Sequence, residues 1–302
     1  MNITLYPDLK YHQEDLIDVS GGKIWYGIYG KGNKIPLLVI HGGPGISHYY
    51  LLSFFKEFSD ANNRPIIFYD QLGCGRSERP SNRSLWTVEK FRERLNEIVK
   101  ALSLQRFHLW GHSWGTQLAL AYAATTPPKQ LLSVSLNSPI FDIPSYRADL
   151  QDLLKSLSQK VQNDINRNQP DFESYLAALS IFYRHFLHMA DLWPDGFLKA
   201  FTGEQFGLES YSTMVGTDEL NYTGNLKDRD DSHLLWDLQV PIWFVCGKND
   251  IARPQRCTKY HKIVPGSEIT IFQNSSHSYF DEERTAYSIA LNDFVNRHDA
   301  CN

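Results

Sequence analysis

The chain has 302 residues and a formal net charge of −4, from 30 Lys and Arg against 34 Asp and Glu. Hydrophobic residues make up 42% of it, enough for a large buried core, which excludes an intrinsically disordered protein. The charge balance excludes a nucleic-acid partner, which would require a basic surface. The longest apolar run, Leu118–Ala124, is far shorter than the ~20 residues that span a bilayer, so we also expect no membrane partner.

Two features of the sequence predict where the protein resides. Acidic residues at Asp8 and Glu14 precede any hydrophobic signal segment, so we expect no secretory leader. The cysteines show no CxxC pair and no disulfide-like spacing, which favours reduced thiols; they are Cys74, Cys246, Cys257 and Cys301. We therefore expect a cytoplasmic protein.

Strand and helix patterns alternate over the first 140 residues. Short apolar runs predict strands at Lys23–Tyr29, Pro36–Ile40, Arg64–Asp70, Arg106–Trp110 and Leu131–Asn137. Helices are predicted at Tyr49–Phe58, Thr87–Leu104 and Thr116–Ala124. Strands that are apolar throughout, rather than at every second residue, indicate a mostly parallel sheet with helices on both faces.

The pattern becomes helical throughout from Phe141 to about Asp228. One predicted helix covers Leu150–Val161 and another covers Phe172–Phe186. The alternation then resumes, with a strand at Pro241–Cys246, a helix near Gln255–Ile263, a strand at Glu268–Phe272 and a helix from about Asp281 to Arg297. We predict an α/β core of residues 1–140 and 229–302, interrupted by an all-helical cap over residues 141–228. This cap has 13 acidic and 7 basic residues, a net charge of −6, which leaves the core at +2.

A GxSxG motif at Gly111–Gly115 lies between a predicted strand and a predicted helix. This is the context of a nucleophile elbow, where glycines on both sides of a serine relieve crowding in a sharp turn. Ser113 is therefore the candidate nucleophile. A serine hydroxyl needs a base to take its proton and a third group to orient that base.

The base and its partner are expected later in the chain, in the order Ser, Asp or Glu, His. Asp250 follows the apolar strand Pro241–Cys246, and His277 follows the strand Glu268–Phe272. Both lie on loops after strands, the edge where α/β sheets build their sites. We predict His277 as the base and Asp250 as its orienting acid, with Asp70 as the alternative acid.

A glycine-rich loop, His41–Gly45, follows the strand Pro36–Ile40. Such a loop can direct a backbone N–H toward the nucleophile and form an oxyanion hole together with the N–H after the serine. We predict Gly43 and Trp114 as the two donors, and we expect Gly42 to contact the substrate. The loop has neither of the spacings typical of phosphate-binding loops.

Taken together, the motifs at His41–Gly45, Asp70–Ser77, Gly111–Gly115 and Gly247–His277 resemble those of the proline iminopeptidase family of α/β-hydrolases. The resemblance implies an α/β-hydrolase fold and a serine aminopeptidase that removes an N-terminal residue, often proline, from short peptides. It also implies a helical cap whose acidic residues hold the free amino group of the substrate.

The stretch Gly216–Gly224 is similar to part of the cap in the tricorn-interacting aminopeptidase branch of this family. In that branch a glutamate binds the amino group, and the matching residue is Glu219. A second glutamate follows the catalytic aspartate there, whereas this chain has Ile251. Amino-acid amidase and carboxylesterase activities of the same fold therefore stay open, and a ligand-binding receptor on a hydrolase fold is a further alternative.

We expect the reaction to need no cofactor and no metal. His185 and His188 are three residues apart on a predicted cap helix, but no third ligand accompanies them. The predicted partner is a short peptide, or an aminoacyl amide or ester.

Overall fold

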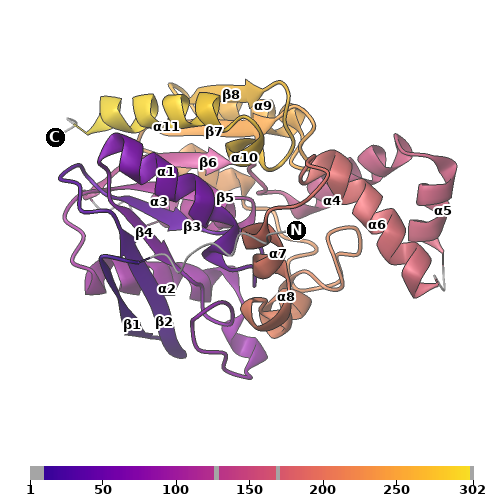
Figure 1. The fold of residues 1–302 in the computed structure, drawn as a ribbon, viewed down its shortest axis with the longest axis horizontal. Helices are drawn as coiled ribbons and strands as arrows, with labels where there is room; N and C mark the ends of the chain where they lie inside the picture. The colour runs from indigo at the N-terminus through magenta and orange to yellow at the C-terminus, as the bar shows by residue number, and fades with distance from the viewer. Residues whose placement is uncertain (1–9, 126–128, 168–170, 300–302) are drawn as a thin grey trace.

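The computed structural model describes residues 10–125, 129–167 and 171–299. Within these residues, eight strands form one sheet in the order β1-β2-β4-β3-β5-β6-β7-β8 (Figure 1). The strands are β1 (Gln13–Val19), β2 (Gly22–Tyr29), β3 (Leu37–Ile40), β4 (Ile66–Tyr69), β5 (Phe107–His112), β6 (Leu131–Asn137), β7 (Ile242–Gly247) and β8 (Glu268–Phe272). β2 pairs antiparallel with both β1 and β4, and all other neighbours are parallel. The predicted mostly parallel sheet is confirmed.

Helices connect the parallel strands. Those of the core are α1 (Leu52–Asn62), α2 (Val88–Ala101), α3 (Trp114–Thr125), α9 (Pro254–Ile263), α10 (Tyr279–Glu282) and α11 (Arg284–His298). Between β6 and β7 lie α4 (Ile143–Lys155), α5 (Gln159–Asn166), α6 (Phe172–Phe186), α7 (Asp195–Phe201) and α8 (Leu208–Met214). Short 3-10 turns are η1 (His48–Leu51), η2 (Arg83–Leu85), η3 (Gly203–Gln205) and η4 (Ser232–Asp237).

Two side chains of β5, one at an odd and one at an even position, show which helices cover each face of the sheet. Phe107 contacts Tyr122 of α3, with ring centroids 6.5 Å apart. Trp110 lies edge-on to Phe55 of α1 at 4.9 Å and donates its indole N–H to the hydroxyl of Tyr287 on α11. Because side chains at odd and even positions of a strand point to opposite faces, α3 covers one face and α1 and α11 cover the other.

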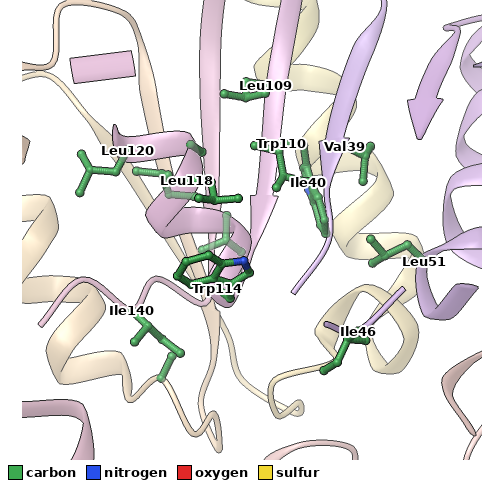
Figure 2. Close-up of a cluster of buried hydrophobic side chains, with 14 of the residues drawn as sticks. Val39, Ile40, Ile46, Leu51, Leu109, Trp110, Trp114, Leu118, Leu120 and Ile140 are labelled. Carbon is green, nitrogen blue, oxygen red and sulfur yellow. The ribbon is translucent and has the colours of Figure 1, made fainter. Parts of the chain in front are cut away.

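The core continues from the sheet to the loops where the strands end. Figure 2 shows Val39 and Ile40 of β3 beside Trp110 of β5, with Trp114 at the start of α3 and Ile140 below it. All five side chains are buried. Apolar packing therefore fixes the ends of β3 and β5, from which the glycine-rich loop and Ser113 emerge.

The segment between β6 and β7 leaves and re-enters the core at one point. Asp142 and Asp230 form an isolated antiparallel bridge, in which Ile143 N–H donates to Arg229 C=O at 2.9 Å and Asp231 N–H donates to Phe141 C=O at 2.8 Å. In Figure 1, α5 and α6 extend from the end of the molecule opposite β1 and β2.

Three details of the predicted elements were wrong. The single helix over Leu150–Val161 is two helices, because the hydroxyl of Ser158 caps a new helix start by accepting the N–H of Val161. The C-terminal helix is also two helices, α10 and α11, which are separated at Glu283; no side chain caps the start of α11. The strand β1 was missed because most of its side chains are exposed and polar, so it lacks the apolar pattern of a core strand.

No helix in the described parts of the chain is long and apolar enough to cross a membrane.

Candidate active site

Ser113 lies in the turn between β5 and α3, with a φ of 55°. This left-handed conformation is strained for a residue with a side chain, as a nucleophile elbow requires. The flanking glycines leave no room for a Cβ: at Gly111 it would lie 2.5 Å from the carbonyl oxygen of Gly115, and at Gly115 it would lie 2.4 Å from that of Ile40. Ser113 N–H donates to Asn137 C=O at 2.8 Å, which ties the turn to β6.

The glycine-rich loop after β3 faces this serine. A Cβ on Gly42 would lie 3.3 Å from the Cβ of Ser113, so the loop backbone passes directly beside Ser113. Gly42 N–H donates to the Tyr50 hydroxyl at 2.8 Å. Within the described residues, the N–H groups of Gly43 and Trp114 have no such acceptor. Trp114 is the first residue of α3, where backbone N–H groups lack helical partners.

Asp250 and His277 meet after β7 and β8. The Nδ1 atom of His277 lies 2.6 Å from Oδ1 of Asp250, and both side chains are buried. The carboxylate accepts three further hydrogen bonds, from the hydroxyl of Ser138 at 2.6 Å and from the N–H groups of Gly247 and Ala252. These bonds fix the position of the carboxylate beside His277. With Nδ1–H donated to Asp250, Nε2 of His277 carries the lone pair that a general base uses.

One cavity brings the predicted residues together. Its empty space, which includes a part open to solvent, is about 590 Å³, and its wall includes Ser113, His277, Gly42, Gly43, Trp114 and Glu219. Asp250 lies behind His277. The rest of the wall is largely apolar or aromatic, formed by Ile46, Tyr50, Ile140, Ile143, Tyr146, Leu187, Phe197, Phe201, Tyr222 and Ile251, with His112 and Gln117 as further polar members. Such a cavity suits a small substrate with an apolar residue.

Asp70, the alternative acid, has a different partner. Its carboxylate accepts from Nδ1 of His48 at 2.7 Å and from the backbone N–H groups of His48 and Arg76. Burial would raise the pKa of Asp70, but the charge of His48 and its hydrogen bond outweigh burial and lower it. Asp70 therefore belongs to a buried pair separate from His277.

Glu219 lies beyond α8 and contributes to the wall of the cavity. The hydroxyl of Tyr183 on α6 donates to Oε2 of Glu219. Burial raises the pKa of Glu219 against the hydrogen bonds from Tyr183 and Tyr211, which lower it. A positive group entering the cavity would oppose this effect of burial and favour the charged carboxylate. Ile251, in the position of the second glutamate, lies in the same wall and adds no charge.

The histidine pair considered as half a metal site is not assembled. α6 ends at Phe186, so only His185 is on the helix; His188 is buried beyond it, 3.7 Å from Glu282 and 3.8 Å from Asp281.

Another group of donors, His41, Asp70 and Cys74, lies within 4.8 Å. Its atoms are already engaged: His41 Nε2 accepts the N–H of Gln71, and Cys74 Sγ donates to the Gln71 carbonyl. Burial raises the pKa of Cys74, which disfavours the thiolate that binds metals.

The sequence analysis missed Ser138, Tyr50 and His112. Ser138 directly follows β6, so the rule that sites form after the ends of parallel strands could have identified it. His112 is inside the GxSxG motif, at a position where the motif accepts any residue. Tyr50 has no sequence signal, because its role depends on where η1 places it.

The fold and the cavity define a hydrolase of the α/β type, and comparisons with known proteins agree. Residues 35–284 match the family model of the alpha/beta hydrolase fold. The chain is 37% identical to the proline iminopeptidase of Heyndrickxia coagulans over 94% of this chain and 99% of that protein. It is 32% identical to the proline iminopeptidase of Saccharolobus solfataricus, over 92% and 91%. The chain belongs to the proline iminopeptidase family.

Solved structures show the same fold. The crystal structure of VinJ has a TM-score of 0.90 and 26% identity, covering 96% of this chain and all of that one. The proline iminopeptidase of Mycobacterium smegmatis has a TM-score of 0.87 at 24% identity, covering 95% of this chain and 99% of that one. The expected family and fold are confirmed.

Proposed function

We propose that the protein is a serine aminopeptidase that releases an N-terminal residue, proline or another small apolar residue, from short peptides. The observation that carries this proposal is the hydrogen bond between Asp250 and His277, since His277 lines one cavity together with Ser113 and Glu219. Three relatives that are 32–37% identical to this chain are named proline iminopeptidase, which supports the same activity.

In the proposed reaction, Nε2 of His277 takes the proton of Ser113 as Oγ bonds to the scissile carbonyl carbon. The N–H groups of Gly43 and Trp114 stabilise the resulting oxyanion. As the C–N bond breaks, His277 gives the proton to the leaving amine, and an acyl-enzyme remains. A water molecule, deprotonated by His277, then hydrolyses the ester and returns the proton to Ser113. Asp250 holds the imidazole and stabilises its charged form throughout.

Glu219 is the proposed anchor for the substrate amino group. An ammonium group that leaves bulk water must find an anion, because an unpaired buried charge is costly. Among the described residues that line the cavity, Glu219 is the only carboxylate. Gly42 is also proposed to contact the substrate, because the loop backbone at Gly42 lies close to Ser113. The helical segment over 141–228, which supplies Glu219, acts as the cap in this proposal.

The predicted cytoplasmic location is part of the proposal. Cys74, Cys246 and Cys257 are free and buried, and free thiols suit a reducing compartment.

An amidase or carboxylesterase activity is the second candidate, and Ile251 is the observation that favours it. With one carboxylate and an apolar wall, the cavity also suits neutral acyl groups. A panel of aminoacyl arylamides, each with a free or a blocked amino group, tested beside simple esters, separates the two candidates. Preferred cleavage of free prolyl or alanyl arylamides supports the aminopeptidase. Equal cleavage of blocked substrates supports the second candidate, and no turnover of any substrate supports a receptor.

A further inference from the structure

His112, the residue before Ser113, connects the glycine-rich loop with the loop that carries His277. Its Nδ1 lies 2.9 Å from the hydroxyl of Tyr50, and that hydroxyl accepts the N–H of Gly42 at 2.8 Å. On the other side, its Nε2 lies 3.0 Å from the backbone carbonyl oxygen of His277. The side chains of Tyr50 and His112 are both buried. Three segments of the site are therefore joined through one imidazole.

The chemistry of the partners sets the direction of each bond. A carbonyl oxygen can only accept, so Nε2–H of His112 donates to His277. In a neutral imidazole Nδ1 is then an acceptor, and the Tyr50 hydroxyl donates to it. Burial, and the charge of the nearby His277, lower the pKa of His112 well below its ordinary value. The chain of bonds is complete when His112 is neutral.

This arrangement affects both the oxyanion hole and the base. Because Tyr50 engages the N–H of Gly42, the loop is held with Gly43 as its remaining donor. The imidazole rings of His112 and His277 are 4.5 Å apart, so a second positive charge on His112 would oppose the charged His277 that forms during the reaction.

We propose that Tyr50 and His112 are positioning residues, which hold the oxyanion loop and the backbone of His277 in the arrangement that the reaction requires. This proposal rests on the proposed roles of Ser113, His277 and Gly43. His112 itself transfers no proton to the substrate, because both of its ring nitrogens are bonded to protein groups.

The test uses two variants that cut the same link. Tyr50→Phe removes the hydroxyl and keeps the ring. His112→Gln keeps an amide N–H near the position of Nε2 but loses the acceptor for Tyr50. We expect each to lower kcat by roughly 10- to 100-fold, since misplacing one oxyanion donor costs up to about 10²–10³. KM should stay within about two-fold. In the double variant the losses should combine to much less than their product, because both remove one connection.

A matched control is Tyr122→Phe, which removes another buried hydroxyl on the far face of the sheet. That hydroxyl has no hydrogen-bond partner among the described residues. Thermal unfolding of all variants shows whether they fold. Tyr122→Phe should retain the wild-type kcat, and a loss there equal to that of Tyr50→Phe would overturn the proposal.

The rate of labelling by an active-site fluorophosphonate separates this proposal from the proposed function. Labelling needs the nucleophile, the base and the oxyanion donors, but no amino terminus. If the wild type labels quickly yet cleaves no aminoacyl arylamide, the aminopeptidase proposal fails, and the labelling rates still test the positioning role. A Tyr50→Phe variant that folds and labels as fast as Tyr122→Phe overturns the positioning role. A rise in KM with unchanged kcat also overturns it, because Tyr50 would then be a substrate contact.

Discussion

Ser138 donates its hydroxyl to Oδ2 of Asp250 at 2.6 Å, on the carboxylate oxygen that does not bond His277. Ser138 has a φ of 54°, and its own N–H donates to Val245 C=O on β7. A strained turn after β6 thus supports the acid that follows β7.

This bond leads to the first prediction. Ser138→Ala should lower kcat by about 10-fold, since a hydrogen bond to a charged group contributes roughly 1.5–3 kcal/mol and the other donors to Asp250 remain. Ser138→Gly removes the same hydroxyl but accepts the positive φ without strain. Steady-state kinetics should give similar losses for both. A loss in Ser138→Ala alone would attribute the effect to the backbone.

The second prediction concerns the nucleophile. Ser113→Ala should lower kcat by about 10⁶-fold and abolish labelling by a fluorophosphonate. Peptide mapping of the labelled wild type should place the adduct on Ser113. Labelling that persists in the variant would contradict the assignment of the elbow.

EDTA should leave the wild-type rate unchanged, and a loss that added metal restores would contradict a metal-free reaction.

The third prediction separates the two buried aspartates. Asp250→Asn should lower kcat by about 10⁴-fold through the wrong tautomer of His277, with the fold retained. Asp70→Asn should instead lower the free energy of unfolding by roughly 3 kcal/mol, because it disrupts the buried pair with His48. Urea unfolding at pH 7 and kinetics on the folded protein measure the two effects. Severe loss of kcat in Asp70→Asn, with a mild loss in Asp250→Asn, would reverse the assignment.

The lowered pKa of Asp70 makes its contribution to stability pH-dependent. A carboxyl whose pKa is lower in the folded state stabilises the fold above its unfolded pKa, and this stabilisation is lost as the pH falls through the folded value. The difference in unfolding free energy between wild type and Asp70→Asn should therefore shrink below about pH 4, the usual range of aspartate. The exposed Asp237 offers a control, since Asp237→Asn should show no such change.

The fourth prediction concerns Glu219. Glu219→Gln keeps the shape and removes the charge, so kcat/KM for free prolyl or alanyl arylamides should fall about 10- to 150-fold, equivalent to 1.5–3 kcal/mol. Small neutral esters should be cleaved as before. Equal losses on both substrates would mean that Glu219 supports the fold. Adding Ile251→Glu to the Glu219→Gln variant places a carboxylate elsewhere in the wall. This second change should partly restore kcat/KM for the arylamides with a free amino group.

The pH dependence gives a second measure of the same role. Because the pKa of Glu219 is raised, this proposed anchor should lose its charge at a higher pH than an ordinary glutamate would. The ratio of kcat/KM for the amine to that for the ester cancels any pH dependence that both reactions share. In the wild type this ratio should fall at the acid end of the profile. In Glu219→Gln it should be low and flat.

The sequence was sufficient to predict most of the fold, because hydrophobic residues recur in short segments between helices, and the strands predicted at Leu131–Asn137 and Glu268–Phe272 have the same bounds as β6 and β8. Ser113 and His277 could be predicted from the sequence for a related reason, because each follows a segment that the sequence identifies as a strand. The contacts of Tyr183 with Glu219 and of His48 with Asp70 could not be predicted, since they join residues far apart in sequence and depend on how loops and cap helices pack. The break between α4 and α5 escaped detection because the apolar spacing continues across it.

The bridge between Asp142 and Asp230 has a consequence for how such a chain can vary. Since the long segment departs from and returns to adjacent backbone positions, its length and sequence can change while β6 and β7 keep their pairing. The entropic cost of a longer excursion grows only with the logarithm of its length. Glu219, which is proposed to select the substrate, lies in this segment. The whole segment between Asp142 and Asp230 can therefore be replaced by another sequence without changing the sheet. Ser113, Asp250 and His277 stay with the sheet, so a new preference can arise without rebuilding the groups proposed to break the bond.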